Sequence, residues 1–432
     1  MSSVWREGTR FEDFPTLEGD AETDVLIIGG GIVGILTAYF LDECGIPYIL
    51  VEKNKLCGGT TQNTTAKITY SHGLIYDKLS KDLGVEGARL YFEANRSAFE
   101  KFAQMCKDID CDYERKDNFV YSTDDRQKLE SELSAAEKIG CNAKLCENVP
   151  LPIKTVGAVC FPSQAQFDPL KFLSVISKGL NIYENTFVID VDGGVASTQR
   201  GKIHAKRVIV ATHFPFINRH GMFFLKLHQH RSYVTALEGC GDVGGMYVDE
   251  SKTGFSFRNY KNLLFVGGGA HRTGEKGGGY DEVRRFTAKN YPNATEKFHW
   301  ATQDCMSLDS MPYIGSYSKN TPRMYTAAGF NKWGMTSSML SAMLLCDMMQ
   351  DKKNEYAELF SPQRSILKPQ LAVNGAVTLK NMLTPTTKRC THLGCALKYN
   401  TAEHTWDCAC HGSRFDCDGE VIDNPAKKRL GK

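Results

Sequence analysis

The chain has 432 residues, with 52 Lys and Arg against 50 Asp and Glu, which gives a formal net charge of +2. This balance, without a basic block, gives no reason to expect a nucleic-acid partner. An apolar content of 42% and a charged content of 24% exclude a disordered chain, and the length predicts two or three domains. No apolar run approaches the roughly 18 residues of a membrane-spanning helix.

The cysteines fall into two groups along the chain. The N-terminus is polar and acidic where a signal peptide would be basic and then apolar, so we expect a cytoplasmic protein. Fifteen cysteines then indicate buried thiols, metal ligands or redox chemistry rather than a disulfide framework. Ten are scattered between Cys44 and Cys346, and the last 43 residues hold the other five: Cys390, Cys395, Cys408, Cys410 and Cys417. We interpret most of the upstream ten as small buried side chains.

A strand, a glycine turn, a helix and a second strand open the folded part of the chain. Residues 24–28 form an apolar run typical of a buried parallel strand. The glycine-rich stretch 29–34 follows, and then a segment with helical spacing that ends near Gly45. Residues 46–51 predict the second strand, with Glu52 at its end. These elements form a complete βαβ unit.

The glycine turn has the spacing of a dinucleotide-binding fingerprint. Gly29, Gly31 and Gly34 would allow a tight turn, close approach to a pyrophosphate, and helix packing on the strand. Glu52, 21 residues after Gly31, would bond a ribose hydroxyl and disfavour a 2′-phosphate. The fingerprint leaves FAD and NAD open. FAD is favoured because there is one fingerprint and because a late glycine-bearing helix start, 329–336, could stabilise negative charge on a reduced flavin.

Several later segments resemble the D-amino-acid oxidase and glycine oxidase class of flavoproteins. Besides the βαβ unit, the resemblance rests on GGTTQNTTAK (58–67), DSMPYIG (309–315) and AAGFNKWGMT (327–336), and it covers about residues 22–351. It implies a discontinuous FAD-binding sheet domain, a mixed sheet over the flavin, and oxidation of an amine C–N bond by hydride transfer. By this resemblance the FAD-binding residues are Gly29, Gly31, Gly34, Glu52, Lys53, Thr61, Val188, Gly329, Phe330, Gly334, Met335 and Thr336.

The C-terminal tail carries two boxes that each contain a cysteine and a histidine. In a Rieske [2Fe-2S] centre, two thiolates hold one iron and two imidazoles hold the other. Cys390 and Cys408 would be the thiolate ligands, and His392 and His411 the imidazoles. A tetrahedral zinc site is the alternative. It leaves the second cysteine of each box unexplained.

These boxes resemble the cytochrome-complex type of Rieske protein. The resemblance implies a Cys395–Cys410 disulfide across the two loops and a potential-tuning hydroxyl at Ser413. Ala409 stands where proline is common and Asn424 where glycine is usual. With few residues before the first box, we expect an abbreviated base that is stabilised by the flavoprotein part. The whole chain resembles bacterial FAD-dependent oxidoreductases with a C-terminal Rieske domain.

The expected fold is therefore α/β, with a discontinuous Rossmann-like FAD-binding domain, a mixed-sheet substrate domain and a small all-β Rieske domain. The expected bounds are a polar leader at 1–21, FAD binding at 22–76, 150–213 and 300–351, substrate binding at 77–149 and 214–299, a linker at 352–388, and the Rieske domain at 389–432.

We expect an FAD-dependent dehydrogenase that oxidises an amine or amino-acid-like small molecule. Its electrons would pass singly through the cluster to an external acceptor, because a simple oxidase needs no iron–sulfur relay. The alternatives are a non-catalytic electron-transfer or redox-sensing module, and an oxygen-using amine oxidase with a vestigial cluster. We expect neither a nucleic-acid partner nor a membrane span.

The residues that face the substrate are the least constrained part of the prediction. Lys67 and Asn331 neighbour the flavin motifs, and Tyr233 and Arg258 lie on expected strands of the middle domain. An arginine there, Arg258 or Arg231, could bind a substrate carboxylate with two hydrogen bonds, although strand arginines more often form salt bridges. We interpret His228 and His230 as structural because no third metal ligand accompanies them.

Overall fold

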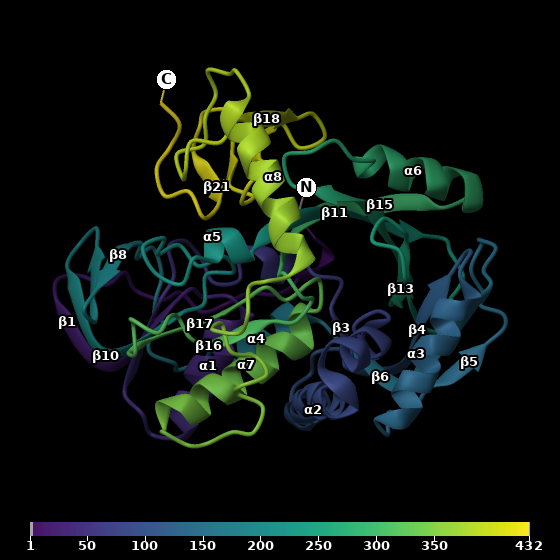
Figure 1. The fold of residues 1–432 in the computed structure, drawn as a ribbon, viewed down its shortest axis with the longest axis horizontal. Coiled ribbons are helices and arrows are strands. Elements are labelled where there is room, and N and C mark those ends of the chain that lie inside the picture. The colour runs from purple at the N-terminus through teal and green to yellow at the C-terminus, as the bar shows by residue number, and fades with distance from the viewer. Residues whose placement is uncertain (1–2, 432) are drawn as a thin grey trace.

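The computed structural model describes residues 3–431, so residues 1–2 of the expected leader and residue 432 of the expected Rieske domain lie outside it. The described chain forms three sheets (Figure 1). Within residues 3–431, no helix combines the length and apolar character needed to cross a bilayer. The α/β fold with a small C-terminal all-β region is confirmed.

The first sheet has eight strands in the order β16-β17-β10-β1-β2-β7, with β9 on β10 and β8 on β9. Strand β1 pairs in parallel with both β10 and β2, as its apolar sequence predicts. Helices α1 and α7 pack against each other below this sheet (Figure 1). The bounds are β1 Ala21–Ile28, α1 Ile32–Glu43, β2 Tyr48–Val51, α4 Pro169–Ile176, β7 Ile182–Tyr183, β8 Val188–Asp192, β9 Val195–Thr198, β10 Lys202–Val210, β16 Tyr313–Ser316, β17 Met324–Ala328 and α7 Gly334–Met349.

The second sheet is mixed and has nine strands, in the order β15-β11-β14-β13-β12-β4-β6-β3, with β5 on β6. Most of its pairs are antiparallel, and β12 lies parallel to β4. The bounds are β3 Lys67–Ile68, α2 Ile75–Met105, β4 Glu114–Ser122, α3 Arg126–Lys138, β5 Lys144–Cys146, β6 Gly157–Gln166, β11 His228–Glu238, β12 Met246–Asp249, β13 Ser256–Tyr260, β14 Leu263–Arg272, α6 Gly279–Asn290 and β15 Thr295–Met306.

The C-terminal part is a four-stranded antiparallel sheet in the order β18-β19-β20-β21, seated above the junction of the two larger sheets (Figure 1). Helix α8 precedes this sheet in the chain and contacts the short helix α5 (Figure 1). The bounds are α5 Phe223–Lys226, α8 Pro369–Leu383, β18 Leu397–Asn400, β19 Thr405–Cys408, β20 Arg414–Phe415 and β21 Val421–Asp423.

Three features differ from the sequence-based expectation. Strand β6, inside the range expected to bind FAD, pairs with β4 in the second sheet. The expected linker at 352–388 contains α8. The polar leader is anchored, because Trp5 is fully buried, donates through its indole Nε1 to the Thr64 carbonyl oxygen at 2.7 Å and packs edge-on against Tyr260.

Candidate functional site

The glycine turn after β1 is built for close backbone approach. Gly29 has a φ of +114°, and a Cβ there would lie 2.6 Å from the Ala211 carbonyl oxygen. A Cβ at Gly34 would lie 1.9 Å from the Gly29 carbonyl oxygen, so α1 packs directly on the turn. Gly31 at the N-cap of α1 has no side chain to cap the helix, so the N–H groups of the first turn other than that of Ile32 remain available to an anionic group.

Glu52 ends β2 beside this turn. Its carboxylate accepts from the Gly30 backbone N–H at 2.8 Å and from the Asn54 N–H at 3.0 Å. Thr61 faces the turn from the other side, and its hydroxyl oxygen accepts from the Ile32 N–H at 3.1 Å. Glu52, Thr61 and Lys53 all line one cavity, so a carboxylate, a hydroxyl and a cation surround the place where a nucleotide would lie.

That cavity is large and continuous. Its volume is about 1840 Å³, against roughly 300–1,000 Å³ for a typical small-molecule site. It extends from the glycine turn past Val188 and the start of α7 to β11 and β15, and reaches the edge of the C-terminal sheet at Glu403. It therefore has room for a dinucleotide and for a second small molecule.

The start of α7 supplies the other end of the cavity. Gly334 and Met335 line it, and no side chain caps the helix. Thr336 anchors the first turn because its hydroxyl donates to the Thr69 carbonyl oxygen at 2.9 Å. The ring of His72 stacks on Trp333 with the centroids 5.2 Å apart. The exposed positive end of this helix dipole suits the negative edge of a reduced flavin.

Lys67 is the candidate catalytic residue whose head group is free in the cavity. It lies on β3 and lines the cavity, and within the described chain its ammonium has no hydrogen-bonding or ion-pair partner. Burial, helped by the neighbouring charge of Arg258, lowers the pKa of Lys67 to about 7. A lysine in this state can accept a proton near neutral pH.

The other three candidate catalytic residues have structural partners. Arg258 is fully buried outside the cavity lining, and its guanidinium donates to the carbonyl oxygens of Thr65 and Ala66 at 2.6 and 3.0 Å. It is therefore not placed to bind a substrate carboxylate.

Tyr233 and Asn331 line the cavity but are engaged elsewhere. The Tyr233 hydroxyl lies 3.1 Å from His271 Nε2 and accepts from Asn400 Nδ2 at 3.3 Å. The Asn331 amide bonds Ser307 and the Gly329 carbonyl oxygen, which orders the loop before α7.

His228 and His230 are neutral residues of the cavity wall. Their rings lie 5.1 Å apart, and burial lowers the pKa of both, that of His230 to about 3. Asp304 and Lys332 lie on the same wall, where burial raises the pKa of the aspartate and lowers that of the lysine. This side of the cavity therefore favours uncharged forms.

The four proposed cluster ligands converge at one end of the C-terminal sheet. Cys390 and His392 come from the loop before β18, Cys408 ends β19, and His411 lies in the loop between β19 and β20. His392 Nδ1 and His411 Nδ1 face each other at 3.3 Å. The two thiols share a hydrogen bond, which lowers the pKa of Cys390. Two thiols paired on one side and two imidazoles on the other match the donor set of a [2Fe-2S] cluster.

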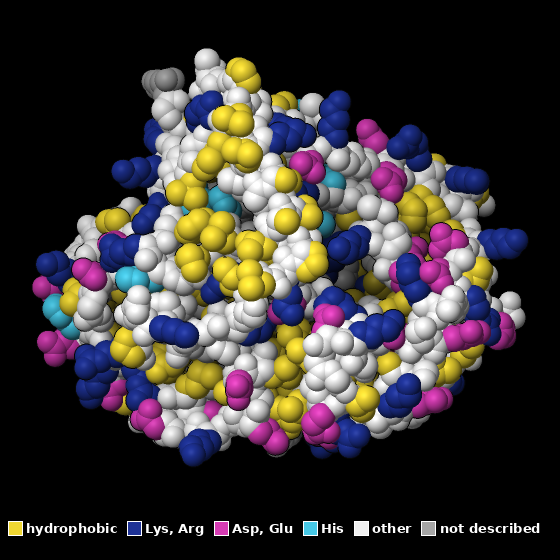
Figure 2. All heavy atoms as spheres, in the orientation of Figure 1, with side chains coloured by type: hydrophobic (Ala, Val, Ile, Leu, Met, Phe, Trp, Pro, Cys, Tyr) yellow, Lys and Arg dark blue, Asp and Glu magenta, His cyan; other side chains and the backbone are white. Residues whose placement is uncertain are grey.

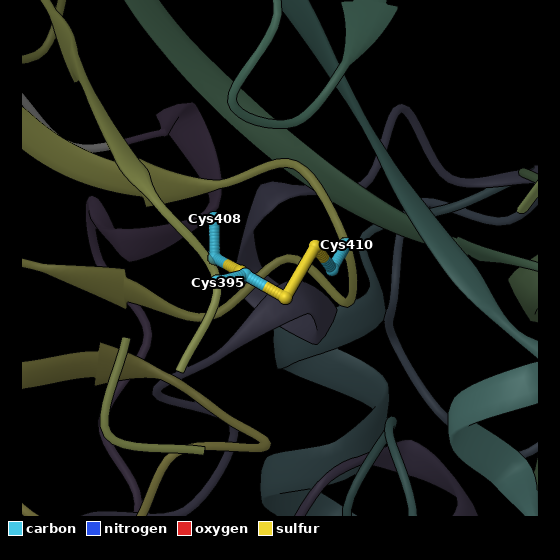
Figure 3. A group of neighbouring side chains, drawn as sticks. All are labelled: Cys395, Cys408 and Cys410. Carbon is cyan, nitrogen blue, oxygen red and sulfur yellow. A yellow bond between two sulfur atoms is a disulfide. The ribbon is translucent and has the colours of Figure 1, made fainter. Parts of the chain in front are cut away.

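A disulfide between Cys395 and Cys410 joins the two ligand loops next to Cys408 (Figure 3). This pairing is confirmed. Ser413 is fully buried, its hydroxyl accepts from the Ala426 N–H at 3.0 Å, and it contacts Cys390. That this hydroxyl tunes the potential of the cluster stays a prediction. Cys417 is exposed and free, with its thiol 3.2 Å from the His404 carbonyl oxygen.

The ligand loops are covered by the flavoprotein part of the chain. The outer nitrogen of His392, Nε2, lies 2.9 Å from Asn218 Oδ1, and the Phe224 carbonyl group bonds the His411 ring. The amide nitrogens of Gln229 and Gln303 donate to the His411 and Gly412 carbonyl oxygens, each at 2.9 Å. The histidine end of the site therefore faces the cavity-bearing domains.

Two further contacts come from polar residues of the two parts. Arg272 Nε donates to the Ala409 carbonyl oxygen at 2.8 Å. Asn424 Nδ2 donates to the carbonyl oxygens of Thr212 and Phe214, both at 2.8 Å. Asparagine at 424 thus makes a domain contact that the usual glycine could not make.

A buried ion-pair network completes this interface. Glu403 accepts from Arg231 Nε at 3.0 Å and from Arg414 NH2 at 2.9 Å. Arg414 also pairs with Asp407 at 3.1 Å and with Asp423 at 3.0 Å. The Arg231 and Arg414 side chains are 4% and 5% exposed. Arg231 is therefore a salt-bridge residue of the domain interface.

Comparison with known proteins places both parts of the chain. The family model described as "FAD dependent oxidoreductase" matches residues 24–348, and the model of the Rieske [2Fe-2S] domain matches residues 350–432. The chain belongs to the FAD-dependent oxidoreductase family.

Similar proteins share this organisation in whole or in part. YhfW of Bacillus subtilis, provisionally named a Rieske 2Fe-2S iron-sulfur protein, is 34% identical over 99% of this chain and 96% of its own. Gamma-glutamylputrescine oxidoreductase of Escherichia coli is 22% identical over 79% of this chain and 87% of its own. Glycine oxidase from Bacillus cereus has a similar fold, with a TM-score of 0.64 at 18% identity over 80% of this chain and all of that one.

The family membership implies FAD and a [2Fe-2S] cluster as cofactors. The residues present fit both groups. A glycine turn, a helix start with glycine at its N-cap and a carboxylate surround the nucleotide end of the cavity, and the cysteine–histidine set suits the cluster.

The residues that join the two parts lie outside every sequence motif. Asn218, Gln229, Arg272, Gln303 and Glu403 carry no motif. Gln229, Arg272 and Gln303 are polar residues on strands, and Asn218 and Glu403 lie in loops, so neither setting identifies a partner.

Proposed function

We propose that this oxidoreductase is a dehydrogenase that oxidises the C–N bond of an amine or amino-acid-like small molecule to the imine. The two electrons would then leave singly through the Rieske centre to an external acceptor. The observation that carries this proposal is the position of the ligand histidines: Asn218 holds the outer nitrogen of His392, and the Phe224 carbonyl group bonds the His411 ring. Electron exchange at the histidine end would therefore be internal to the chain.

Bound FAD would supply a two-electron hydride acceptor, and the bound cluster a one-electron carrier. Gly29, Gly31, Gly34, Glu52, Lys53, Thr61 and Val188 would hold the nucleotide half of FAD, and Gly329, Phe330, Gly334, Met335 and Thr336 would surround the flavin half. Cys390, Cys408, His392 and His411 would hold the cluster.

Lys67 would take the proton from the substrate nitrogen. An amine is protonated at neutral pH and has no lone pair to support loss of hydride from the adjacent carbon. With a pKa of about 7, Lys67 is partly neutral at that pH and can accept this proton. The uncharged wall formed by His228 and His230 would favour the neutral amine. Tyr233 and Asn331 would position the site, and Arg258 would stabilise the chain around Lys67.

Two comparisons support the substrate class. Gamma-glutamylputrescine oxidoreductase and glycine oxidase are both named for substrates with an amine nitrogen. The cavity of about 1840 Å³ also supports an enzyme over a module that only passes electrons between partners.

The test is anaerobic stopped-flow absorbance with a panel of amines and amino acids, with the flavin and cluster bands followed separately. We expect substrate to bleach the flavin first and the cluster second. His392→Ala should abolish the cluster signal and leave flavin bleaching intact. His404→Ala is the matched control, because His404 is an exposed histidine of the same domain outside the ligand set.

Two results would contradict the proposal. Reduction of the flavin that never reaches the cluster would exclude the internal relay. Peroxide production in air that His392→Ala leaves undiminished would indicate an oxygen-using oxidase instead.

A further inference from the structure

Helix α8 has an inverted distribution of polar and apolar side chains. Its two buried residues are asparagines, Asn374 and Asn381, which are 4% and 1% exposed. Asn374 Oδ1 accepts from Arg272 NH1 at 3.0 Å, and Asn374 Nδ2 donates to the Leu225 carbonyl oxygen at 3.4 Å. The helix is therefore attached to the protein through polar groups.

The apolar side chains of this segment point outward. Five large ones form what we call the α8 ridge, and they gather along the helix on the face drawn in Figure 2. Their exposed fractions are 83% for Leu367, 51% for Val373, 60% for Leu379, 42% for Met382 and 72% for Leu383. Single exposed apolar residues are common on protein surfaces and need no explanation. A contiguous group of them indicates an interaction site.

The charged residues of the segment that carries the α8 ridge all have one sign. Residues 359–402 contain no Asp or Glu. Arg364 is paired with Asp309, whereas the remaining cations of this stretch have no carboxylate partner in the described chain: Lys368, Lys380, Lys388, Arg389 and Lys398. The ridge therefore belongs to a segment whose charged side chains are all cations.

We propose that the α8 ridge binds the surface of a bilayer that contains anionic phospholipid. A helix with leucines on one face and cations near it lies in the plane of the interface, with its apolar side chains among the acyl chains and its cations at the head groups. The 15 residues of α8 would lie along about 22 Å of that surface. Leucines as exposed as Leu367 and Leu383 need no complementary pockets in a fluid bilayer.

A second copy of the chain fits this surface less well. Pairing of two ridges about a two-fold axis would bring Lys380 and its cationic neighbours near their own copies, with no acidic residue of the ridge to compensate them. An anionic surface meets the same cations with opposite charge. Charge complementarity therefore favours the bilayer.

The ridge is connected to the first cluster loop. The Ala396 N–H donates to the Asn381 carbonyl oxygen at 2.9 Å. The Arg389 guanidinium donates to the Gly394 carbonyl oxygen at 2.9 Å and to the Thr384 carbonyl oxygen at 3.1 Å. Binding through the ridge would hold the Rieske domain at the membrane surface. The binding itself does not depend on the proposed function. A role of this binding in delivering electrons to an acceptor at the membrane rests on the proposed function.

The test is flotation of the full-length holoprotein, without substrate, on phosphatidylcholine vesicles with and without phosphatidylglycerol. We expect binding to the vesicles that contain phosphatidylglycerol, and at least about a tenfold weaker binding by Leu379→Ser/Leu383→Ser. Lys380→Glu/Lys388→Glu should remove the preference for anionic lipid. Leu83→Ser/Val175→Ser is the matched control, because these residues are 38% and 41% exposed and lie outside the ridge.

The flavin and cluster absorbance of each variant shows whether its fold is intact. Absence of binding to anionic vesicles would overturn the proposal, and so would ridge variants that bind like the wild type. A dimer in analytical ultracentrifugation that Leu379→Ser/Leu383→Ser dissociates would assign the ridge to a second copy instead. Failure of vesicle binding leaves substrate reduction of the flavin in solution unaffected, so it is distinguishable from failure of the proposed function.

Discussion

Glu403→Gln should loosen the contact between the Rieske domain and the mixed sheet. Glu403 is shared by two buried guanidinium groups, Arg231 and Arg414, and its side chain is 15% exposed. Burial raises the pKa of Glu403, but the two arginines more than offset it and hold the pKa below its usual value. The glutamine keeps the shape and removes the charge.

The expected cost follows from what each arginine retains. Arg414 keeps Asp407 and Asp423, whereas Glu403 is the only carboxylate paired with Arg231 in the described chain. Leaving one buried charge unpaired costs about 3–5 kcal/mol. Because the partner geometry survives, we expect a loss near the lower end, about 3 kcal/mol. The stabilisation comes from a depressed carboxyl pKa, so in the wild type it is present above the unfolded pKa and is lost as pH falls through the folded value.

Urea unfolding followed by cluster absorbance measures this loss, because it reports on the Rieske domain directly. Glu420→Gln is the control. Its ion pair with Arg429 has both side chains 57% exposed, and it should cost less than about 1 kcal/mol. Glu403→Gln/Arg231→Met should recover most of the stability, since it removes the stranded charge. Equal losses in Glu403→Gln and Glu420→Gln, or no recovery in the double variant, would refute this reasoning.

Three other substitutions test the cavity and the interface. Lys67→Met should lower the anaerobic rate of flavin reduction about 10²-fold. It should also remove the rise of this rate with pH through about 7, because only the unprotonated lysine accepts a proton. If the variant and the wild type show the same pH dependence in stopped-flow, Lys67 is not the base. Gly34→Ala should abolish FAD retention, measured by flavin absorbance after gel filtration, because its Cβ would lie 1.9 Å from a carbonyl oxygen, whereas Gly375→Ala meets nothing within 4 Å and should retain FAD. Asn424→Gly removes two hydrogen bonds at the interface and should cost about 1–3 kcal/mol in the same urea assay, and an unchanged midpoint would show that these bonds contribute nothing.

The βαβ unit and the cluster site were predictable because each is encoded by residues close together in the sequence. The apolar run of β1, the glycines after it and Glu52 at the end of β2 occur where the βαβ unit requires them. The start of α4 also has a local signal, because Asp168 caps it by accepting from the Leu170 and Lys171 N–H groups and proline follows at the first helical position. The cysteine–histidine boxes identified the cluster chemistry because few donor sets have that composition.

The interface and the direction of individual side chains were not predictable from the sequence. Alternation along a strand shows that Arg258 and its neighbours point to opposite faces, but it does not show which face lines a cavity. Arg231 and Glu403 are 172 residues apart, and nothing local relates them. Helix α8 was missed because its apolar residues lie outside the core, so the pattern gives no buried face to detect.

The covering of the cluster ligands constrains the order in which the protein can be assembled. Cys390, Cys408 and His411 are 3%, 1% and 1% exposed, and the outer nitrogen of His392 is occupied by Asn218. Iron and sulfide delivered by a maturation factor could not reach these groups once the tail has docked. Biogenesis must therefore load the metal centre while the C-terminal domain is still undocked, or reopen the interface to do so. A chain that docks before it is loaded would accumulate as a flavin-containing protein that lacks its iron.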